Sequence, residues 1–562
     1  MTAALWQRAA TAAWRAGLLC TLWLAALPAD AQLRVVSYNT AMGENPGVQT
    51  ARPGLEVVLE AIGAEVRNGF ARPIDVLLLQ EQFSMEVSTQ SIVNVLNSIY
   101  GPGVYARSTL NGQTSDSLGR GGRPGMVYNT QTVQLVSEMF FGDVGTSDGT
   151  GPTPAQQPRS TLRYELKPVG YDDSAVFYAY SAHWKADTGV GNNNRRLVEA
   201  QATRANADAL GEGVHIIYAG DFNIQTSSGT AYQHMLSAGP GQAFDPLNRP
   251  GSWNNNTSFM DLHTQSPAAT GNSQFPGQTL GGMDDRFDFQ LVTGEMLDGM
   301  GLSMIPGSYR AFGNNGTHEF KGNITSGTGA SPAVLTALMQ ASDHLPVVAD
   351  YQLPARMGVD VAAIPPLVEL GSLVTIGVTV TNTAPTALAI GADRLDYTLS
   401  VAGSLMGGAM ATDFAGGGGN LHQITLDTST VGLQTGMLNV VTTRQQAANP
   451  TYFLPIEFQV ISAFLEADFN RDGVVDAADL AAWQGNFGLT GATRAQGDAN
   501  LDGVVDGNDF VIWQRQLGML PAGVTLAGAV PEPASGLAAF TALVAVLSLG
   551  RPRRRPRHAA AA

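Results

Sequence analysis

Residues 214–224, Val-His-Ile-Ile-Tyr-Ala-Gly-Asp-Phe-Asn-Ile, are the most informative stretch of this 562-residue chain. An apolar run of this length that ends at a glycine predicts a buried β-strand. Asp221 and Asn223 follow directly, where the strand should end. Because ligands are commonly bound beyond the ends of packed strands, we expect these two side chains at a functional edge of a sheet.

Five other blocks have the same form, an apolar strand with a carboxylate, an amide or an imidazole at or beside its end. They are LRVVSYNT at 33–40 with Asn39, IDVLLLQEQ at 74–82 with Glu81, VFYAYSAHWK at 176–185 with His183, DDRFDFQLV at 284–292 with Asp285 and Asp288, and ASDHLPVVADY at 341–351 with Asp343 and His344. Each block alone is weak evidence, but six in one region predict a single polar site built from strand ends.

Helical patterns at 54–66 and 195–210 alternate with these strands, so residues 32–352 are predicted to form a layered α/β domain. From 357 to 463 the pattern becomes all-β, with runs such as VTIGVTVTNT and FLPIEFQVI. Short strands separated by turn residues predict a second domain, an immunoglobulin-like β-sandwich. We find no catalytic pattern in it, so a spacer or adhesive role is expected.

The composition excludes several protein classes. The chain has 65 Gly and 29 Pro, only 14% charged residues and a formal net charge of −16, which excludes a coiled coil, a collagen and a multi-span membrane protein. Residues 32–352 hold 18 Lys or Arg and 29 Asp or Glu, a net charge of −11. This balance argues against a protein that coats nucleic acid nonspecifically. An enzyme that holds one phosphodiester through metal ions is still allowed.

The six blocks, in this order, resemble the endonuclease/exonuclease/phosphatase superfamily over nearly all of residues 32–352. The resemblance implies a four-layer α/β sandwich, with two central β-sheets flanked by helices, and metal-dependent hydrolysis of a phosphoester. It further implies catalytic roles for His183, Asp221, Asn223, Asp288 and His344, metal ligation by Asn39, Glu81 and Asp343, and phosphate binding by Arg159.

Within that pattern Asp221 orients or deprotonates the attacking water, and Asn223 donates to the phosphate. His344 lies beside the phosphate, and Asp288 fixes its tautomer. Asp285 is the rival for the acid that holds His344, because some deoxyribonuclease-like members place the acid just before the arginine. Oxygen ligands of this kind suit Mg²⁺, Mn²⁺ or Ca²⁺ better than Zn²⁺, and we expect Mg²⁺ or Mn²⁺.

The substrate is open between several classes at this point. A secreted nuclease acting on DNA or RNA is favoured by the SAHWKA block at 181–186, followed by GDFN at 220–223. A phosphatase and a sphingomyelinase-like phosphoesterase are the alternatives. A surface scaffold component acting mainly through its C-terminal modules is a hypothesis from a different class.

An internal repeat occupies residues 464–520. DFNRDGVVDAADLAAWQGNFG begins at Asp468, and DANLDGVVDGNDFVIWQRQLG begins thirty residues later at Asp498. Oxygen side chains at loop positions 1, 3, 5, 9 and 12, with glycine at position 6, are typical of Ca²⁺ loops. The expected ligands are Asp468, Asn470, Asp472, Asp476 and Asp479 in the first loop, and Asp498, Asn500, Asp502, Asp506 and Asp509 in the second.

This repeat resembles a type I dockerin, which implies two Ca²⁺ ions and a cohesin-like partner. We expect a small core between the two loops made by Leu480, Trp483, Phe487, Phe510 and Trp513.

Both ends of the chain have the form of sorting signals. Residues 1–31 combine basic residues, an apolar run and a small-x-small cleavage site, as in a secretory signal peptide. Cys20 is the only cysteine and lies within it, so no disulfide-linked partner is expected. Residues 529–557 resemble a PEP-CTERM signal, which implies cleavage near Pro533 by an exosortase-type enzyme. The expected location is the outer surface or exterior of a Gram-negative-type bacterium.

Overall fold

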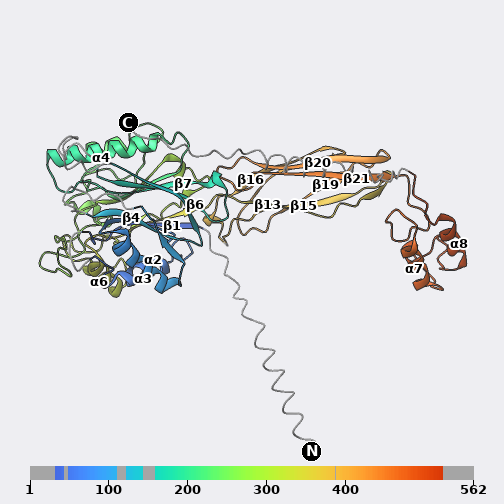
Figure 1. The fold of residues 1–562 in the computed structure, drawn as a ribbon, viewed down its shortest axis with the longest axis horizontal. Coiled ribbons are helices and arrows are strands. Elements are labelled where there is room, and N and C mark those ends of the chain that lie inside the picture. The colour runs from blue at the N-terminus through green and yellow to red at the C-terminus, as the bar shows by residue number, and fades with distance from the viewer. Residues whose placement is uncertain (1–31, 44–48, 111–121, 143–158, 387, 523–562) are drawn as a thin grey trace, which may run out of the picture. The chain divides into compact units, whose positions relative to one another are not determined.

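The computed structural model describes residues 32–43, 49–110, 122–142, 159–386 and 388–522 (Figure 1). The predicted signal peptide at 1–31 and sorting signal at 529–557 lie outside these residues. The chain divides into two compact units. Of the described residues, those within 1–363, 375–426 and 436–456 belong to the first unit, and those within 364–374, 427–435 and 457–522 belong to the second.

Two β-sheets form the centre of the N-terminal region. The first has the order β10 (Ser303–Met304), β12 (Val347–Gln352), β1 (Gln32–Asn39), β2 (Val76–Gln82), β4 (Arg123–Asn129) and β3 (Tyr105–Arg107), with β11 (Arg310–Ala311) also paired to β12. The second has the order β5 (Val133–Phe141), β6 (Thr161–Pro168), β7 (Phe177–His183), β8 (Ile216–Asp221) and β9 (Asp288–Val292). The pairs β1–β2 and β7–β8 are parallel, so their carboxyl ends meet at one edge.

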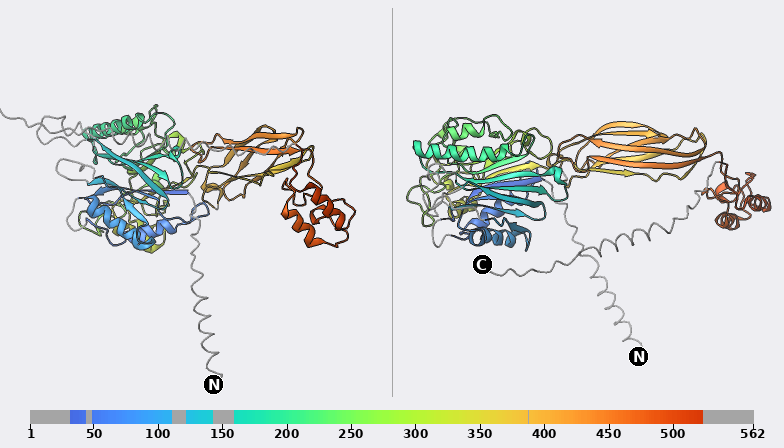
Figure 2. Two further views of the ribbon diagram at one scale, coloured as in Figure 1. Left: turned by 45° about the vertical axis from the view of Figure 1, so that its right-hand side comes forward. Right: turned by 45° about the horizontal axis from the view of Figure 1, so that its top comes forward.

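Helices cover the outer face of each sheet (Figures 1 and 2). One face packs against α2 (Leu55–Ala64), α3 (Gln90–Tyr100) and α6 (Pro332–Ala341), and the other against α4 (Val190–Asp208) and α5 (Thr230–Met235). A third apolar core, which includes Val35 and Leu78 of the first sheet and Leu162 and Ile217 of the second, lies between the sheets. The order of layers is therefore α/β/β/α, which agrees with the four-layer sandwich that the family resemblance implies for residues 32–352.

Polar side chains also join the two sheets inside this apolar core. Gln290 donates its amide to the carbonyls of Val35, at 3.0 Å, and Val347, at 2.7 Å. Gln80 donates to the Ser181 hydroxyl at 3.0 Å. Buried polar groups are costly unless they are paired, so these bonds favour one relative position of the sheets over sliding alternatives.

The helices follow the expected pattern, with one difference at a boundary. The helical pattern predicts a helix from residue 195, but α4 begins at Val190, because the polar residues 192–194 continue the helix on its exposed side. α6 begins with the Ser331 side chain accepting from the Val334 backbone N–H, and Pro332 stands at its first position, a common start signal. Among the described residues, no helix has the length and apolar character needed to span a bilayer.

Short helical turns complete the chain at η1 (Met85–Thr89), η3 (Asp173–Ala175), η4 (Thr257–Leu262), η5 (Gly294–Met296), η6 (Ile324–Ser326), η7 (Ala389–Gly391) and η8 (Arg494–Gln496).

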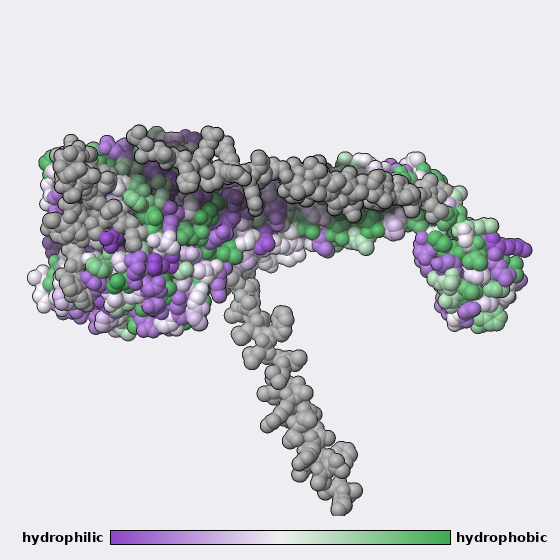
Figure 3. Space-filling view, viewed as in Figure 1, coloured by the Kyte–Doolittle hydropathy of each residue, from purple (hydrophilic) through white to green (hydrophobic). Residues whose placement is uncertain are grey.

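The all-β region contains two sheets, as predicted. One has the order β13 (Met357–Val361), β15 (Thr375–Asn382), β19 (Asn420–Leu426) and β17 (Leu405–Met406); the other has β14 (Leu367–Glu369), β21 (Thr451–Ile461), β20 (Gly432–Thr442), β16 (Leu395–Gly403) and β18 (Gly408–Asp413). Side chains of β15 alternate between buried and more exposed positions, the pattern of a strand with one face on a core. Hydrophobic and hydrophilic residues are interspersed along the visible part of this region in Figure 3.

Two helices, α7 (Ala477–Asn486) and α8 (Gly507–Gln516), follow the two acidic loops. Asp476 and Asp506 cap them with matching capping boxes. Trp483 donates its indole N–H to the Asp506 carbonyl at 2.8 Å, and Trp513 donates to the Asp476 carbonyl at 2.9 Å, so each repeat closes on the other.

The predicted core between the two loops is largely present. Trp513 is buried, and Leu480, Trp483 and Phe510 pack against the cluster. Phe487 is a correction, because it follows the last turn of α7 and its side chain is 61% exposed.

We expect the folding stability to fall in acid because of one buried histidine just before the fourth strand of the second sheet. His215 is buried just before β8, and burial lowers its pKa from 6.5 to about 4. The unfolded chain therefore binds a proton at a higher pH than the folded chain. The contribution to folding stability is complete above pH 6.5 and is lost as the pH falls toward 4, by up to about 3 kcal/mol.

In a His215→Gln variant this loss is absent, so the midpoint of urea unfolding should depend less on pH between 6.5 and 4.5 than in the parent chain. Denaturant titrations at a series of pH values measure it. The same pH dependence in both proteins would contradict the assignment.

Candidate active site

The register of the strands brings the predicted residues to one edge of the two sheets. In the parallel pair β1–β2, Asn39 lies opposite Gln80, so Glu81 is the next residue along. In the second sheet His183 lies opposite Asp221, and Asp221 lies opposite Asp288. Three neighbouring strands therefore present an imidazole and two carboxylates in one row.

Asn39 connects the two sheets at this edge. Its amide nitrogen donates to Glu81 Oε1 at 3.0 Å and to Asp221 Oδ2 at 3.2 Å. Its amide oxygen accepts from the Ala41 backbone N–H at 3.0 Å. Asn39 thus acts here as a donor that holds two carboxylates together, and the predicted role as an oxygen ligand would require its amide to turn over.

Glu81 stands at a bend just beyond the apolar part of β2. Its φ is +54°, and the backbone of Gly122 packs so closely that a Cβ on Gly122 would lie 2.5 Å from Glu81 Cα. Burial and the negative charge of Asp343 raise the pKa of Glu81 to about 8. A bend and a crowded backbone therefore hold a carboxylate where its charge is unfavourable, unless a cation or proton is present.

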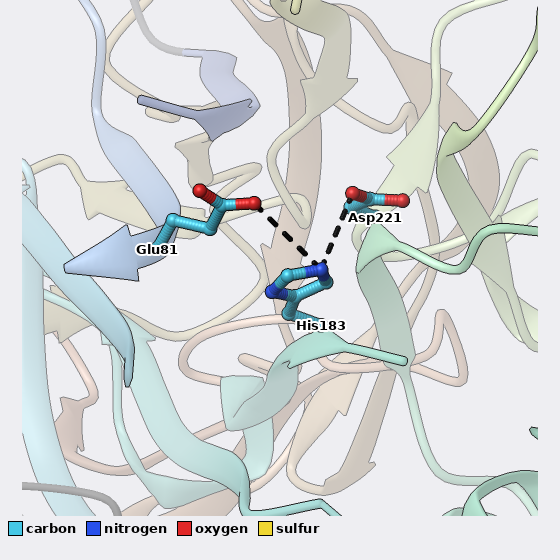
Figure 4. A group of neighbouring side chains, drawn as sticks. All are labelled: Glu81, His183 and Asp221. Carbon is cyan, nitrogen blue, oxygen red and sulfur yellow. Dashed lines mark ion pairs between the residues drawn. The ribbon is translucent and has the colours of Figure 1, made fainter. Parts of the chain in front are cut away.

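His183 lies between two carboxylates, as Figure 4 shows. Its Nε2 is 3.8 Å from Glu81 Oε1 and 3.6 Å from Asp221 Oδ2. The sequence provides no clear acidic partner for this histidine, and the structure brings these two acids to it from different strands.

His344 is held by the acid at 288. Its Nδ1 is 2.7 Å from Asp288 Oδ2, and its Nε2 is 3.7 Å from Asp221 Oδ2. Burial lowers the pKa of His344, but Asp288 and Asp221 outweigh burial and raise it well above the usual value. The rival acid Asp285 instead accepts a hydrogen bond from the Asn254 amide.

Asp343 precedes this histidine and faces the same cleft. Its Oδ2 accepts from the Thr279 backbone N–H at 2.9 Å, and its buried Oδ1 has no hydrogen-bond partner among the described residues. Arg52 fixes the adjoining chain by donating to the carbonyls of Ala341, at 3.0 Å, and Ala41, at 3.0 Å. Nothing in the sequence around Arg52 indicates this role, because it depends on a carbonyl 289 residues away along the chain.

Asp221 and Asn223 form a tight polar turn after β8. The Asn223 backbone N–H donates to Asp221 Oδ1 at 3.1 Å, and the Asn223 amide donates to the Trp184 carbonyl at 3.1 Å. Burial raises the pKa of Asp221 to about 7, although His344 acts in the opposite direction. Asn223 has φ +52°, a conformation that asparagine tolerates better than most residues.

Arg159 lies directly behind this turn. It donates from Nη1 to the same Trp184 carbonyl at 2.8 Å, and its backbone N–H donates to Glu199 Oε1 at 3.2 Å. The side chain also lines the cleft. The guanidinium group that binds the Trp184 carbonyl is therefore the same group that is predicted to contact the phosphate.

These residues surround a cleft of about 540 Å³. Its lining includes Glu81, Arg159, His183, Asp221, Asn223, Asp343 and His344 from the predicted set, together with Lys185, Arg195, Gln265 and Phe275. Gln265 places its side-chain amide 3.0 Å from His344 Nε2. It lies in an irregular segment with no strand pattern, which is why the sequence analysis did not single it out.

The donor atoms suit a hard divalent cation. The ligand atoms of Glu81, His183 and Asp221 lie within 4.8 Å of one another, as do those of Asp221, Asp288 and His344. Buried carboxylates with raised pKa values and the unpartnered Asp343 Oδ1 are the features that a bound cation would satisfy. The cleft can thus combine a cation, a base and an imidazole around one substrate atom.

Comparisons with known proteins add similarities of structure only. No family model and no curated protein matches the chain. An endonuclease/exonuclease/phosphatase family protein from Bacteroides thetaiotaomicron is 16% identical, with 57% of this chain and 97% of that chain covered and a TM-score of 0.33. The human nocturnin catalytic domain with bound sulfate is 17% identical, with 57% of this chain and 95% of that chain covered and a TM-score of 0.33. D. rerio TDP2 complexed with single-strand DNA product is 14% identical, with 57% of this chain and 100% of that chain covered and a TM-score of 0.35.

Proposed function

We propose that residues 32–352 form a divalent-metal-dependent phosphoester hydrolase whose substrate is a phosphodiester of DNA or RNA. The observation that carries this proposal is the His344–Asp288 pair at 2.7 Å, with Asp221 beside it and Glu81 in the same cleft. Phosphodiester hydrolysis needs charge neutralisation, a base for water and a group that contacts the phosphoryl oxygens. The cleft contains a candidate for each.

Glu81 and Asp343 are the residues best placed to hold Mg²⁺ or Mn²⁺, with Asn39 as the third ligand once its amide turns over. When bound, the cation would neutralise charge on the phosphoryl group and on the leaving oxygen. The positive charge of the bound cation would offset the burial and the charge of Asp343 that raise the pKa of Glu81.

Asp221 and His344 are the residues proposed for acid–base chemistry in this cleft. Asp288 accepts a hydrogen bond from the Nδ1–H of His344, which fixes the ring and directs Nε2 toward Asp221 and the cleft. Asp221 orients the attacking water and takes its proton. Asn223 lies two residues away on a rigid turn, and its amide can donate to the phosphoryl oxygens when it leaves the Trp184 carbonyl.

Other phosphoesters are tested alongside nucleic acid. The purified chain would be assayed against plasmid DNA, RNA, sphingomyelin and small phosphomonoesters. Cleavage of nucleic acid supports the proposal. Turnover of sphingomyelin or monoesters alone would leave the site in place and replace the proposed substrate by that of a sphingomyelinase-like enzyme or a phosphatase.

We predict that substitutions of two neighbouring acidic residues have very different effects on the activity of the enzyme. Asp288→Asn replaces the charged acceptor of the His344 Nδ1–H bond by a neutral amide, which can hold the ring in the other tautomer, and it should lower kcat by a factor of about 10²–10⁴. Asp285→Asn is the matched control, because Asp285 contacts Asn254 instead of the histidine, and its kcat should stay close to that of the parent. Initial rates on plasmid DNA with Mg²⁺ measure the effect, with thermal unfolding to check the fold. Equal losses would contradict the assignment of Asp288.

We predict that Glu81 controls metal affinity. Chelation should abolish hydrolysis, and added Mg²⁺ or Mn²⁺ should restore it. Glu81→Ala should weaken Mn²⁺ binding by at least about 10–100-fold, followed by electron paramagnetic resonance of free Mn²⁺. Glu138→Ala on β5 is the control, because that carboxylate caps the Thr109 backbone outside the cleft. Unchanged Mn²⁺ affinity in Glu81→Ala would contradict the metal assignment.

We also propose that the two acidic loops bind one Ca²⁺ each and form a dockerin-like docking module for a cohesin-like partner. The supporting observation is the same in both repeats. Asp468 Oδ2 accepts from the Gly473 backbone N–H at 2.9 Å, and Asp498 Oδ2 accepts from Gly503 at 2.8 Å. The other oxygen of each aspartate is buried with no hydrogen-bond partner among the described residues, as a cation ligand would be.

Calcium stoichiometry tests this module. In a Glu81→Ala background, which limits binding at the active site, isothermal titration should give two Ca²⁺ per chain. Asp468→Asn and Asp498→Asn should each remove one. Asp360→Asn on the exposed side of β13 is the control. Two bound ions in all three variants would contradict the loops as Ca²⁺ sites, and circular dichroism verifies folding.

The location is a proposal as well. We infer that the signal at 1–31 directs export and that an exosortase-type enzyme cleaves near Pro533. The enzyme would then act at the outer surface or in the exterior, where the docking module holds it.

A further inference from the structure

Three cationic residues line the same cleft as the carboxylates. They are Arg159, Lys185 and Arg195. The same lining includes Glu81, Asp187, Asp221 and Asp343, so the cleft combines positive and negative side chains within a domain that holds 18 Lys or Arg against 29 Asp or Glu. Clustered cations of this kind raise the local concentration of an anionic ligand.

One buried carboxylate organises all three. Glu199 on α4 is 1% exposed. Its Oε1 accepts from the Arg159 backbone N–H at 3.2 Å and lies 3.9 Å from Arg195 Nε, and its Oε2 accepts from the Lys185 backbone N–H at 2.8 Å. Burying a carboxylate is costly unless each oxygen is satisfied, and here both are satisfied by the residues that carry the positive charges.

The loop that carries Lys185 is also held from its carbonyl side. Arg196 is buried, and its Nη1 donates to the carbonyl of Lys185 at 2.5 Å and to that of Asp187 at 2.9 Å. Lys185 Nζ is 3.1 Å from Asp187 Oδ2, a side chain that is 75% exposed. Lys185 Nζ also donates to the Ala186 carbonyl at 3.1 Å. An ion pair with so exposed a carboxylate contributes little, so an incoming oxyanion can replace Asp187.

We infer that Lys185 and Arg195, with Arg159 beside them, form a second anion subsite next to the hydrolytic centre, which binds a phosphate other than the one that is cleaved. The inference rests on the proposed function and narrows its substrate class to phosphoesters that carry a second phosphate. In a polynucleotide that group is the neighbouring phosphate of the strand. Glu199 is the positioning residue of this subsite.

The arrangement gives the two phosphates different partners. The scissile phosphate takes the carboxylate side of the cleft, beside His344 and the residues that would hold a cation. The second phosphate takes the basic side, where charge-assisted hydrogen bonds from lysine and arginine suit an oxyanion without needing a metal. Arg159 on the basic side and Asn223 on the carboxylate side both donate to the Trp184 carbonyl. This one backbone group therefore connects the two sides of the cleft.

Two chromogenic substrates that differ in one phosphate test the subsite. Thymidine 5′-(p-nitrophenyl phosphate) has only the scissile group, and its 3′-phosphorylated form has a second one. The full chain with Mg²⁺ should show a higher kcat/KM for the 3′-phosphorylated form. Lys185→Gln and Arg195→Gln should each reduce the ratio of the two kcat/KM values about tenfold, chiefly through KM. Lys167→Gln is the control, because its ammonium pairs with Asp173 outside the cleft.

Glu199→Gln should reduce the same ratio, because it keeps the size of the side chain but weakens its hold on the basic residues. Loss of kcat on both substrates with an unchanged ratio would reduce Glu199 to a purely structural role. An unchanged ratio in Lys185→Gln and Arg195→Gln would overturn the subsite.

A binding measurement separates failure of the subsite from failure of the proposed function. Thymidine 3′,5′-bisphosphate would be titrated into the full chain and the same variants by calorimetry. Binding that weakens in Lys185→Gln but not in Lys167→Gln, without turnover of either substrate, would support the subsite and contradict the hydrolase. Equal binding by both variants would contradict the subsite whatever the activity.

Discussion

The site depends on one polar contact between two sheets. Asn39 at the end of β1 donates to Glu81 of its own sheet and to Asp221 of the other. The contact forms only if the sheets are packed in one register, and the apolar core between them and the buried bonds from Gln290 set that register. Two strand ends far apart in sequence are thereby held within hydrogen-bonding distance of one side chain.

Holding acids this close has an energetic consequence. Burial and nearby charge raise the pKa of Glu81 to about 8, and burial raises that of Asp221 to about 7. Such clusters are unfavourable in a protein that lacks a use for them, and they are typical of sites where a cation or a proton is bound. The apolar layers and the α4 and α6 helices stabilise the fold and so offset the unfavourable burial of these carboxylates.

Much of this arrangement could be predicted from sequence, for a physical reason. Strand-end residues such as Asp221 and His344 carry their own signal, because a buried strand must end where polar side chains begin. The sequence favours Asp288 and leaves Asp285 as a rival, since both follow the same pattern, and the three-dimensional register shows which of them contacts His344. Glu199 has a local signal only for Arg195, four residues earlier on α4, and none for its contacts with the backbone N–H groups of Lys185 and Arg159.

Diffraction from crystals grown with Mn²⁺ tests the central claim most directly, because the anomalous signal of manganese locates the cation without assuming any activity. The account predicts a peak between Glu81 and Asp343, with the Asn39 amide turned to present its oxygen. A fully occupied ion elsewhere on the chain, with no peak at Glu81 under saturating Mn²⁺, would contradict it.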